Sequence, residues 1–297
     1  LFRSYYGEAT DIAAVAWFPW VVDLSAVSGN LNKVTKLTIG VEGSGSTGML
    51  YIDDIRLYPK APVYVTPAQP DAANLVASYQ FEGNANDSSG HGLNGTVTQG
   101  EFVGSDRTGG GSALQLKKTG YVDLGNRPSL DFGTTDWTVT AWYKNLMSGT
   151  ADADKGTIFG KGGDNTGGIR YALIMSETTS GVVSLITDDD VTKYTVDSTS
   201  VTNDDEWHFV AGQREGTALR IYIDGRLEKT AAVNAAYSLA GTSSHNAYIG
   251  AMTYEVDDTL YKFYNGLIDD VRVYNKALSD GEILGLVGRI APMAKPF

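Results

Sequence analysis

The sequence predicts an all-β protein built mainly from one β-sandwich. Short apolar or alternating runs, bounded by glycine and asparagine, recur along the chain, whereas the 3.6-residue period of helices is nearly absent. Glycine is frequent, with 35 residues in a chain of 297, which suits many tight turns. Regular short strands separated by turns are typical of a β-sandwich.

Apolar or alternating patterning marks most of the expected elements. The strands with the clearest pattern are 37–41, 49–58, 75–81, 113–116, 137–143, 171–175, 182–186, 207–213, 219–223, 247–249 and 266–274. One short helix is expected at 279–284, because Ser279 can cap its first turn and Glu282, three residues on, completes a capping box.

A proline-rich stretch between Tyr58 and Asn74 indicates the domain organisation. Its four prolines favour an extended linker, which we place at 60–73. The region 1–59 holds too few strands for a full sandwich, so we expect it to be a smaller partial β-sandwich that starts inside a longer precursor; alternatively, it packs its open edge on the second domain. The main sandwich is expected at 74–284 and an extended tail at 285–297.

Composition limits the classes of partner. The net charge of −12 disfavours binding to nucleic acid and to anionic membranes. No apolar run approaches the roughly 20 residues of a membrane span. The chain has no cysteine, which excludes thiolate catalysis, zinc ribbons and disulfides. This acidic, glycine-rich composition favours an extracellular or cell-surface location.

A repeated string points to a cation. The sequence Ile-Asp-Asp-Ile-Arg-Leu-Tyr at 52–58 returns at 268–274 as Ile-Asp-Asp-Val-Arg-Val-Tyr. Because alternate strand residues share a face, we expect Asp53 to lie with the apolar positions 55 and 57, and Asp269 with 271 and 273. Asp270 and Arg272 then share the opposite face and can pair with each other. A carboxylate on an apolar face needs a positive partner.

Calcium is the expected partner of the inward carboxylates, because it binds six to eight oxygens. The candidate ligands are Glu82, Asp87 and Asp269 in the main sandwich, and Asp53 in the N-terminal piece. The alternative is that Asp87 only caps its turn and that Asp269 pairs with a lysine.

An ordered set of short segments resembles one known family. It starts at 79–96 and continues with 113–116, 121–125, 138–142, 207–211, 219–225, 248–250 and 266–278. In this order and spacing, the set resembles the laminin-G-like, concanavalin A-like lectin and glucanase jelly rolls over residues 74–284. The segments 20–24, 35–40 and 51–58 resemble the end of a galactose-binding-like carbohydrate-binding sandwich. Together they are similar to multidomain secreted bacterial proteins.

The resemblance implies a two-sheet jelly roll that binds sugars on a concave face or on rim loops, often with a calcium ion. A sugar offers apolar ring faces and hydroxyls, so it needs aromatic side chains beside polar ones. The richest such cluster precedes the last strand and comprises Tyr248, Tyr254, Tyr261, Phe263 and Tyr264, interleaved with Asp257, Asp258, Lys262 and Asn265. A second candidate is Arg170 with Tyr171. The alternative is that these tyrosines are ordinary half-buried strand residues.

Catalytic motifs are incomplete. Glucanases of the resembling fold carry Glu-x-Asp-x-x-Glu on one strand, but here Glu255 and Asp257 are followed by Leu260. His91 and His208 are expected to be structural. We therefore expect a noncatalytic polysaccharide- or glycan-binding module with structural calcium. The alternatives are a glycoside hydrolase with acids such as Glu206, Glu255 and Asp257, or an adhesion module that binds no sugar.

Overall fold

The computed structural model describes residues 64–104, 106–146, 156–164, 168–176, 179–240, 245–254, 257–290 and 292–294, together with Lys36 and Ile39. The strands expected at 37–41 and 49–58, and with them Asp53, lie outside this description apart from Ile39. The chain forms two compact units, one of residues 1–66 with 291–297 and one of residues 67–290. In the first unit, β1 (Tyr64–Val65) pairs antiparallel with β17 (Met293–Ala294).

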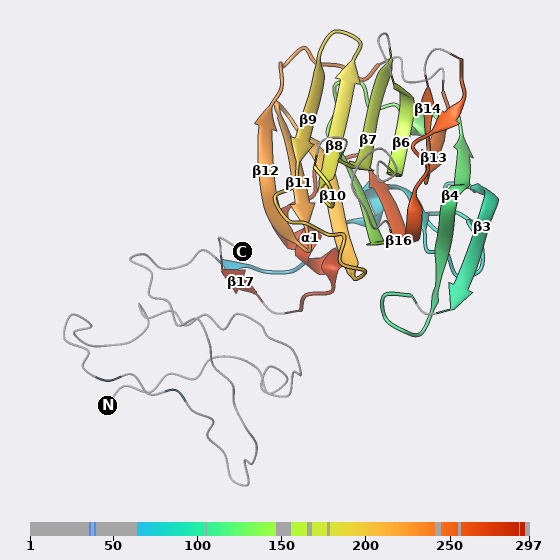
Figure 1. The fold of residues 1–297 in the computed structure, drawn as a ribbon. Coiled ribbons are helices and arrows are strands. Elements are labelled where there is room, and N and C mark those ends of the chain that lie inside the picture. The colour runs from blue at the N-terminus through green and yellow to red at the C-terminus, as the bar shows by residue number, and fades with distance from the viewer. Residues whose placement is uncertain are drawn as a thin grey trace. The chain divides into compact units, whose positions relative to one another are not determined.

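The larger unit confirms the predicted all-β sandwich (Figure 1). Its strands are β2 (Leu75–Tyr79), β3 (Thr96–Gly104), β4 (Ser112–Gly125), β5 (Trp137–Asn145), β6 (Thr157–Asp164), β7 (Ile169–Met175), β8 (Val183–Asp189), β9 (Lys193–Asp197), β10 (Trp207–Glu215), β11 (Ala218–Ile223), β12 (Arg226–Ala232), β13 (Ala247–Ile249), β14 (Met252–Tyr254), β15 (Leu260–Tyr261) and β16 (Asn265–Tyr274). The helical segments are η3 (Ala72–Asn74), η4 (Pro128–Leu130) and α1 (Asp280–Val287).

One continuous strand order runs β12-β11-β10-β5-β16-β4-β13-β6-β7-β8-β9, with β2 paired to β16 and β3 to β4. The order folds into two layers. A Cβ on Gly212 of β10 would touch Leu173 of β7 and Leu185 of β8, so these strands face each other across the core. The hairpin β14–β15 joins β6 through a parallel pairing of β14.

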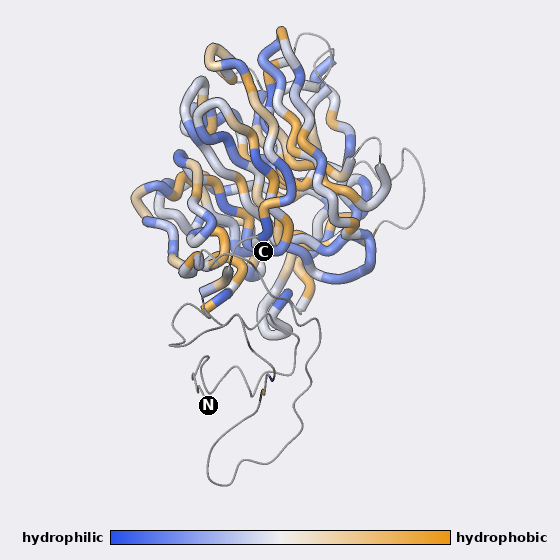
Figure 2. Tube along the Cα trace, turned by 90° about the vertical axis from the view of Figure 1, so that its left-hand side faces the viewer, coloured by the Kyte–Doolittle hydropathy of each residue, from blue (hydrophilic) through white to orange (hydrophobic). Residues whose placement is uncertain are grey.

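Strand periodicity produces the core between the layers. In β7, the alternate residues Tyr171, Leu173 and Met175 belong to the main core, whereas Ala172 and Ile174 form a second apolar cluster on the outer face. Met252 of β14 completes that outer cluster, and Tyr261 of β15 packs against it. Figure 2 shows apolar and polar positions alternating along the strands.

Helix α1 closes the C-terminal part of the larger unit and confirms the expected helix. The predicted capping box is present, since the Ser279 backbone N–H donates to Glu282 Oε2 at 2.8 Å and the Glu282 N–H donates to Ser279 Oγ. The helix ends at Gly288, whose φ of 89° is left-handed. Its apolar residues cover Phe209, Ala211 and Tyr222 on the outer face of β10 and β11. None of the helices in the described ranges is long and apolar enough to cross a membrane.

A β-bulge in β16 corrects the expected orientation of Asp269. The register shifts between Asp269 and Arg272, and Asp270 has a φ of 46°. Asp269 lies opposite Trp142 of β5, whereas Val273 lies opposite Val139, which is in the main core. The extra residue inverts the alternation, so Asp269 does not share a face with positions 271 and 273. It is nevertheless buried, with 3% of its surface exposed.

Candidate functional site

The outer face of β4 and β13 carries a group of aromatic and polar side chains. In β4, Val122 and Leu124 point into the core, so Tyr121 and Asp123 point outward. The same alternation places Tyr248 of β13 outward, directly opposite Asp123 in the antiparallel register. Two strands separated by more than a hundred residues in the sequence therefore bring a ring and a carboxylate together.

Three half-buried rings form what we call the aromatic patch: Tyr121, Tyr248 and Phe263. The centroids of Tyr121 and Tyr248 lie 5.8 Å apart with an edge-to-face geometry. Phe263, which precedes β16, lies 6.2 Å from Tyr121. Such packing holds the rings in fixed positions while part of each surface stays accessible.

Polar atoms fix the carboxylate beside the patch. Asn246 Nδ2 lies 3.0 Å from Asp123 Oδ1 and 3.1 Å from Oδ2, and donates to them. The Gly125 N–H donates to Oδ1 at 2.8 Å. Burial, and then the negative charge of Asp123, raise the pKa of the Tyr248 hydroxyl. The aromatic patch therefore combines an apolar surface, the Tyr248 hydroxyl and, at its edge, the Asp123 carboxylate, which hydrogen bonds hold in position.

The β14–β15 hairpin adds a second aromatic pair. Tyr254 and Tyr261 lie 5.4 Å apart, and Lys262 Nζ lies 4.9 Å from the centre of the Tyr261 ring. Residues 257–259 of the turn are exposed, and Asp257 accepts from Thr259 Oγ1 at 2.6 Å. Its neighbour Asp258 lies 3.3 Å from the His245 ring, which brings the turn close to the start of β13.

The structure brings only some of the predicted sugar-binding residues to the surface. Tyr248, Tyr254 and Tyr261 are half-buried, and Asp257 is exposed. Tyr264 and Tyr171 are instead buried in the core at 0% and 1% exposure, so their rings offer no face to a ligand.

Tyr171 and Arg170 occupy structural positions that correct the second candidate. The Tyr171 hydroxyl donates to the Leu130 carbonyl at 2.9 Å. Arg170 is buried and forms an ion pair with Asp188 at 3.3 Å. Both side chains therefore hold the sandwich together at positions closed to a sugar.

Asp87 organises its own turn. Its Oδ1 accepts from the backbone of Ser78 and Ser89, and its Oδ2 accepts from Ser89 Oγ and from the Leu93 backbone. These hydrogen bonds lower the pKa of Asp87 against the opposing effect of burial. With both oxygens occupied, Asp87 does not fit the predicted metal-ligand set, and the turn-capping alternative describes its contacts.

Glu82 and Asp269 lie near a different carboxylate, Asp106. A Cβ on Gly111 would collide with both Glu82 Oε1 and Asp106 Oδ2, so these two carboxylates converge on that glycine. Asp106 also adds to the negative field at Asp269. Burial, and then the charge of Asp270, raise the pKa of Asp269 to about 7. The sequence signal for Asp106 is the glycine-rich turn that follows it.

The carboxylate of Asp270 forms ion pairs with two arginines, and one of these pairs confirms the predicted pairing with Arg272. Arg272 lies 3.1 Å from Asp270 Oδ1, and Arg107 lies 2.9 Å from Oδ2. The Arg107 guanidinium also stacks over the Trp142 ring at 4.7 Å. Within the described ranges, no three His, Cys, Asp or Glu side chains form a group that could hold a metal ion.

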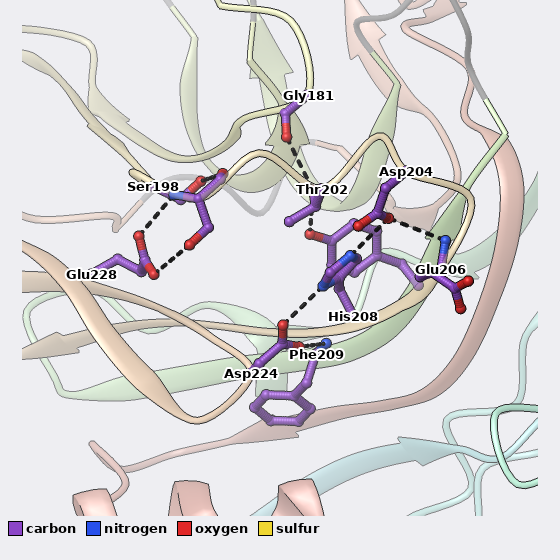
Figure 3. Close-up of polar contacts among 11 residues, drawn as sticks. Gly181, Ser198, Thr202, Asp204, Glu206, His208, Phe209, Asp224 and Glu228 are labelled. Atoms are coloured by element: carbon purple, nitrogen blue, oxygen red, sulfur yellow. Dashed lines mark hydrogen bonds and ion pairs between the residues drawn. The ribbon is translucent and has the colours of Figure 1, made fainter. Parts of the chain in front are cut away.

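A third polar cluster surrounds His208 at the start of β10 (Figure 3). Its Nδ1 lies 2.8 Å from Asp224 Oδ2 and its Nε2 lies 3.0 Å from Asp204 Oδ1. On the same loop, Thr202 accepts from the Tyr143 hydroxyl at 2.8 Å. These contacts fasten the loop before β10 to its neighbours, in agreement with a structural role for His208.

Within the described residues, the acids considered for a hydrolase do not lie together as a pair of catalytic carboxylates. Glu206 and Asp257 are exposed, on the loop before β10 and on the hairpin turn respectively. Glu255 lies outside the described residues. Asp257 is held by Thr259, and these hydrogen bonds lower its pKa. His91 lies at a turn, where its Nδ1 is 3.1 Å from Ser89 Oγ.

Comparisons with known proteins agree with the β-sandwich fold described above. The family model Laminin_G_3, described as the concanavalin A-like lectin/glucanases superfamily, matches residues 116–284. No curated protein sequence matches the chain.

Two solved structures illustrate the similarity. Domain 4 of AbnA, an extracellular arabinanase from Geobacillus stearothermophilus in complex with arabinotriose, is 20% identical with a TM-score of 0.57, covering 72% of this chain and 98% of that one. The ligand-binding domain of botulinum neurotoxin serotype D, in complex with N-acetylneuraminic acid, is 17% identical with a TM-score of 0.55, covering 73% and 51%. At these identities the likeness establishes the fold.

Proposed function

Because the chain belongs to the concanavalin A-like lectin/glucanase superfamily, we propose that it is a noncatalytic carbohydrate-binding module that takes a glycan on the outer face of β4 and β13. The observation that carries this proposal is the aromatic patch beside the held Asp123–Asn246 pair. A sugar can lay its C–H face on the rings while its hydroxyls donate to the carboxylate. The sugar-bound structures of similar fold support this choice of ligand class.

A glycan panel followed by calorimetry tests the proposal. We expect Tyr248→Ala to weaken binding on the order of tenfold, because losing a stacking face costs about 1.4 kcal/mol. Tyr248→Phe keeps the ring and should retain most of the affinity. Equal binding by wild type and Tyr248→Ala would move the site elsewhere. Release of reducing ends from any panel member would favour the hydrolase alternative, and flat binding curves throughout would favour an adhesion module.

A calcium ion bound through Asp269 is the second part of the proposal. No group of three carboxylate or imidazole side chains among the described residues forms a site, so backbone oxygens and water would have to supply most of its ligands. The support is the buried carboxyl of Asp269, for which a cation would offset the burial. Chelator should lower the melting temperature and added calcium should restore it; a melting temperature indifferent to both rules the ion out.

An extracellular or cell-surface location within a larger multidomain protein completes the proposal. The acidic composition, with a net charge of −12, supports this location. Each module of such a protein can bind weakly, because tethering raises the effective concentration of the next. Fractionation of the cells that express the protein tests this location.

A further inference from the structure

We propose that the aromatic patch selects uncharged sugars over anionic ones, and that Asp123 is the residue that determines this specificity. The inference rests on the proposed function and names the class of glycan for the same site. It follows from a carboxylate that the fold holds beside the rings, and from the charges of the side chains around it.

The position of Asp123 is fixed from two directions. Its backbone lies in β4, opposite Tyr248 of β13, and its side chain is half-buried. The Asn246 amide reaches both carboxylate oxygens, and the Gly125 N–H holds Oδ1. A sugar stacked on Tyr248 would therefore meet this carboxylate at its edge.

The chemistry of that edge distinguishes two kinds of ligand. A hydroxyl donates a hydrogen bond to a carboxylate, and such charge-assisted bonds are stronger than neutral ones. A ligand carboxylate or sulfate brings no proton to donate and places a like charge beside Asp123. Repulsion of this kind is largest where protein lowers the local dielectric.

The charges around the patch are of both signs, and the carboxylates nearest to it besides Asp123 lie on the adjacent hairpin turn. Asp257 and Asp258 are exposed on the adjacent hairpin turn, and Asp258 already faces His245. Among the basic side chains, Lys161 is buried against Asp131 at 3.2 Å and Arg170 pairs with Asp188. Arg127 lies beside Gly125, where its Nε donates to the Leu124 carbonyl, and Lys118 is exposed on β4. Lys262 lies over the Tyr261 ring. The whole chain adds a net charge of −12.

Matched ligands that differ only in charge test the inference. We would titrate the full chain with trigalacturonate and with its trimethyl ester, and with 3′-sialyllactose and with the methyl ester of 3′-sialyllactose. In each pair the uncharged sugar should bind at least tenfold more tightly, and added salt should narrow the gap. Equal affinities within a pair whose neutral member binds would overturn the inference while leaving the proposed function intact. If no neutral sugar on the wider panel binds either, both fail.

Asp123→Asn isolates the responsible group. The amide oxygen can still accept hydrogen bonds, so the neutral sugar should lose only a few-fold in affinity while discrimination against the anion falls to about threefold or less. Glu101→Gln on β3 is the matched control, because it removes one negative charge from an exposed ion pair with Lys117 of β4. Equal effects of the two variants would assign the selectivity to net charge and overturn the role of Asp123. Melting curves of both variants check that the fold is retained.

Discussion

Both ring nitrogens of His208 face a carboxylate, an arrangement that only the imidazolium can satisfy with two N–H donors. Hydrogen bonds and charges from Asp224 and Asp204 raise the pKa of His208, against the lowering effect of burial. Asp224 also accepts from the Phe209 N–H at 2.8 Å. The proton on His208 therefore ties the loop before β10 to the turn between β11 and β12.

This geometry predicts a pH dependence. Because the folded pKa of His208 lies above the unfolded value of about 6.5, its stabilisation is complete below about pH 6.5 and is lost as pH rises through the folded pKa. The melting temperature of wild type should exceed that of His208→Gln at pH 6, and the gap should shrink by pH 9. A gap independent of pH would contradict the prediction, and His91→Gln is the control histidine.

Asp269 contributes a separate pH effect in a lower range. Its pKa is raised from 3.8 to about 7, so the folded protein binds its proton more tightly and loses this contribution as pH rises between these two values. The comparison of wild type with His208→Gln removes this background, because Asp269 is present in both.

Substitution of Asp87 should reduce stability by more than is usual for a turn residue. Asp87→Ala removes the acceptor of three backbone N–H groups, at Ser78, Ser89 and Leu93, and should lower the free energy of unfolding by about 2–3 kcal/mol. Asp87→Asn keeps one oxygen acceptor, so its free energy of unfolding should lie between those of wild type and Asp87→Ala. Urea denaturation measures both changes. A cost below about 0.5 kcal/mol for Asp87→Ala would show that the turn forms without its carboxylate.

At the scale of elements, the sequence predicted the strands that bury an apolar face and missed most of those that do not. The interior strands β5, β7, β8, β10, β11 and β16 were expected, because their alternation is strong. The strands β9 and β12 end the sheet order, and β3 is an edge as well. Their residues are largely exposed or half-buried, so the apolar period is weak. In β6, glycines at 160, 162 and 163 dilute the same signal.

The candidate site was predictable only where its residues lie close together in the sequence. Tyr248, Tyr254 and Tyr261 were expected as surface aromatics near the last strand. Tyr121 and Asp123 were not, because their proximity to Tyr248 depends on the register of β4 with β13. The bulge at Asp270 was equally hidden, since a positive φ at an aspartate leaves no periodic signature.

The contact between helix α1 and the preceding segment yields a prediction for one glycine. The Ala68 N–H donates to the Gly281 carbonyl at 2.9 Å, and a Cβ on Gly285 would collide with the Ala68 carbonyl oxygen. Gly285→Ala gains about 1 kcal/mol of helix propensity but must push backbone aside, at a cost of roughly 1–3 kcal/mol. We expect net destabilisation of about 1 kcal/mol by urea denaturation.

The control for Gly285→Ala is Gly110→Ala. A Cβ on Gly110 would approach only Thr108 Oγ1, at 3.8 Å, and its φ is not left-handed. This variant should leave the unfolding midpoint nearly unchanged. A stabilised Gly285→Ala variant would show that the segment 67–69 shifts at no cost.

At the scale of the whole molecule, every residue of the three apolar clusters lies between positions 75 and 287, within the unit 67–290. The aromatic patch, Asp123 and α1 belong to the same unit. The chain has no cysteine, so no disulfide contributes to the stability of this unit, and its core is large enough to supply most of it.

A fragment of residues 67–290 should therefore fold and bind glycan as the full chain does. The fragment contains every residue of the three apolar clusters, and it also contains the strand pairings that place Tyr248 beside Asp123. We expect one cooperative unfolding transition, and glycan affinity within about twofold of the full chain. Calorimetry and titration with the same sugar measure both. A fragment that folds but fails to bind would place an essential part of the site in residues 1–66 or 291–297.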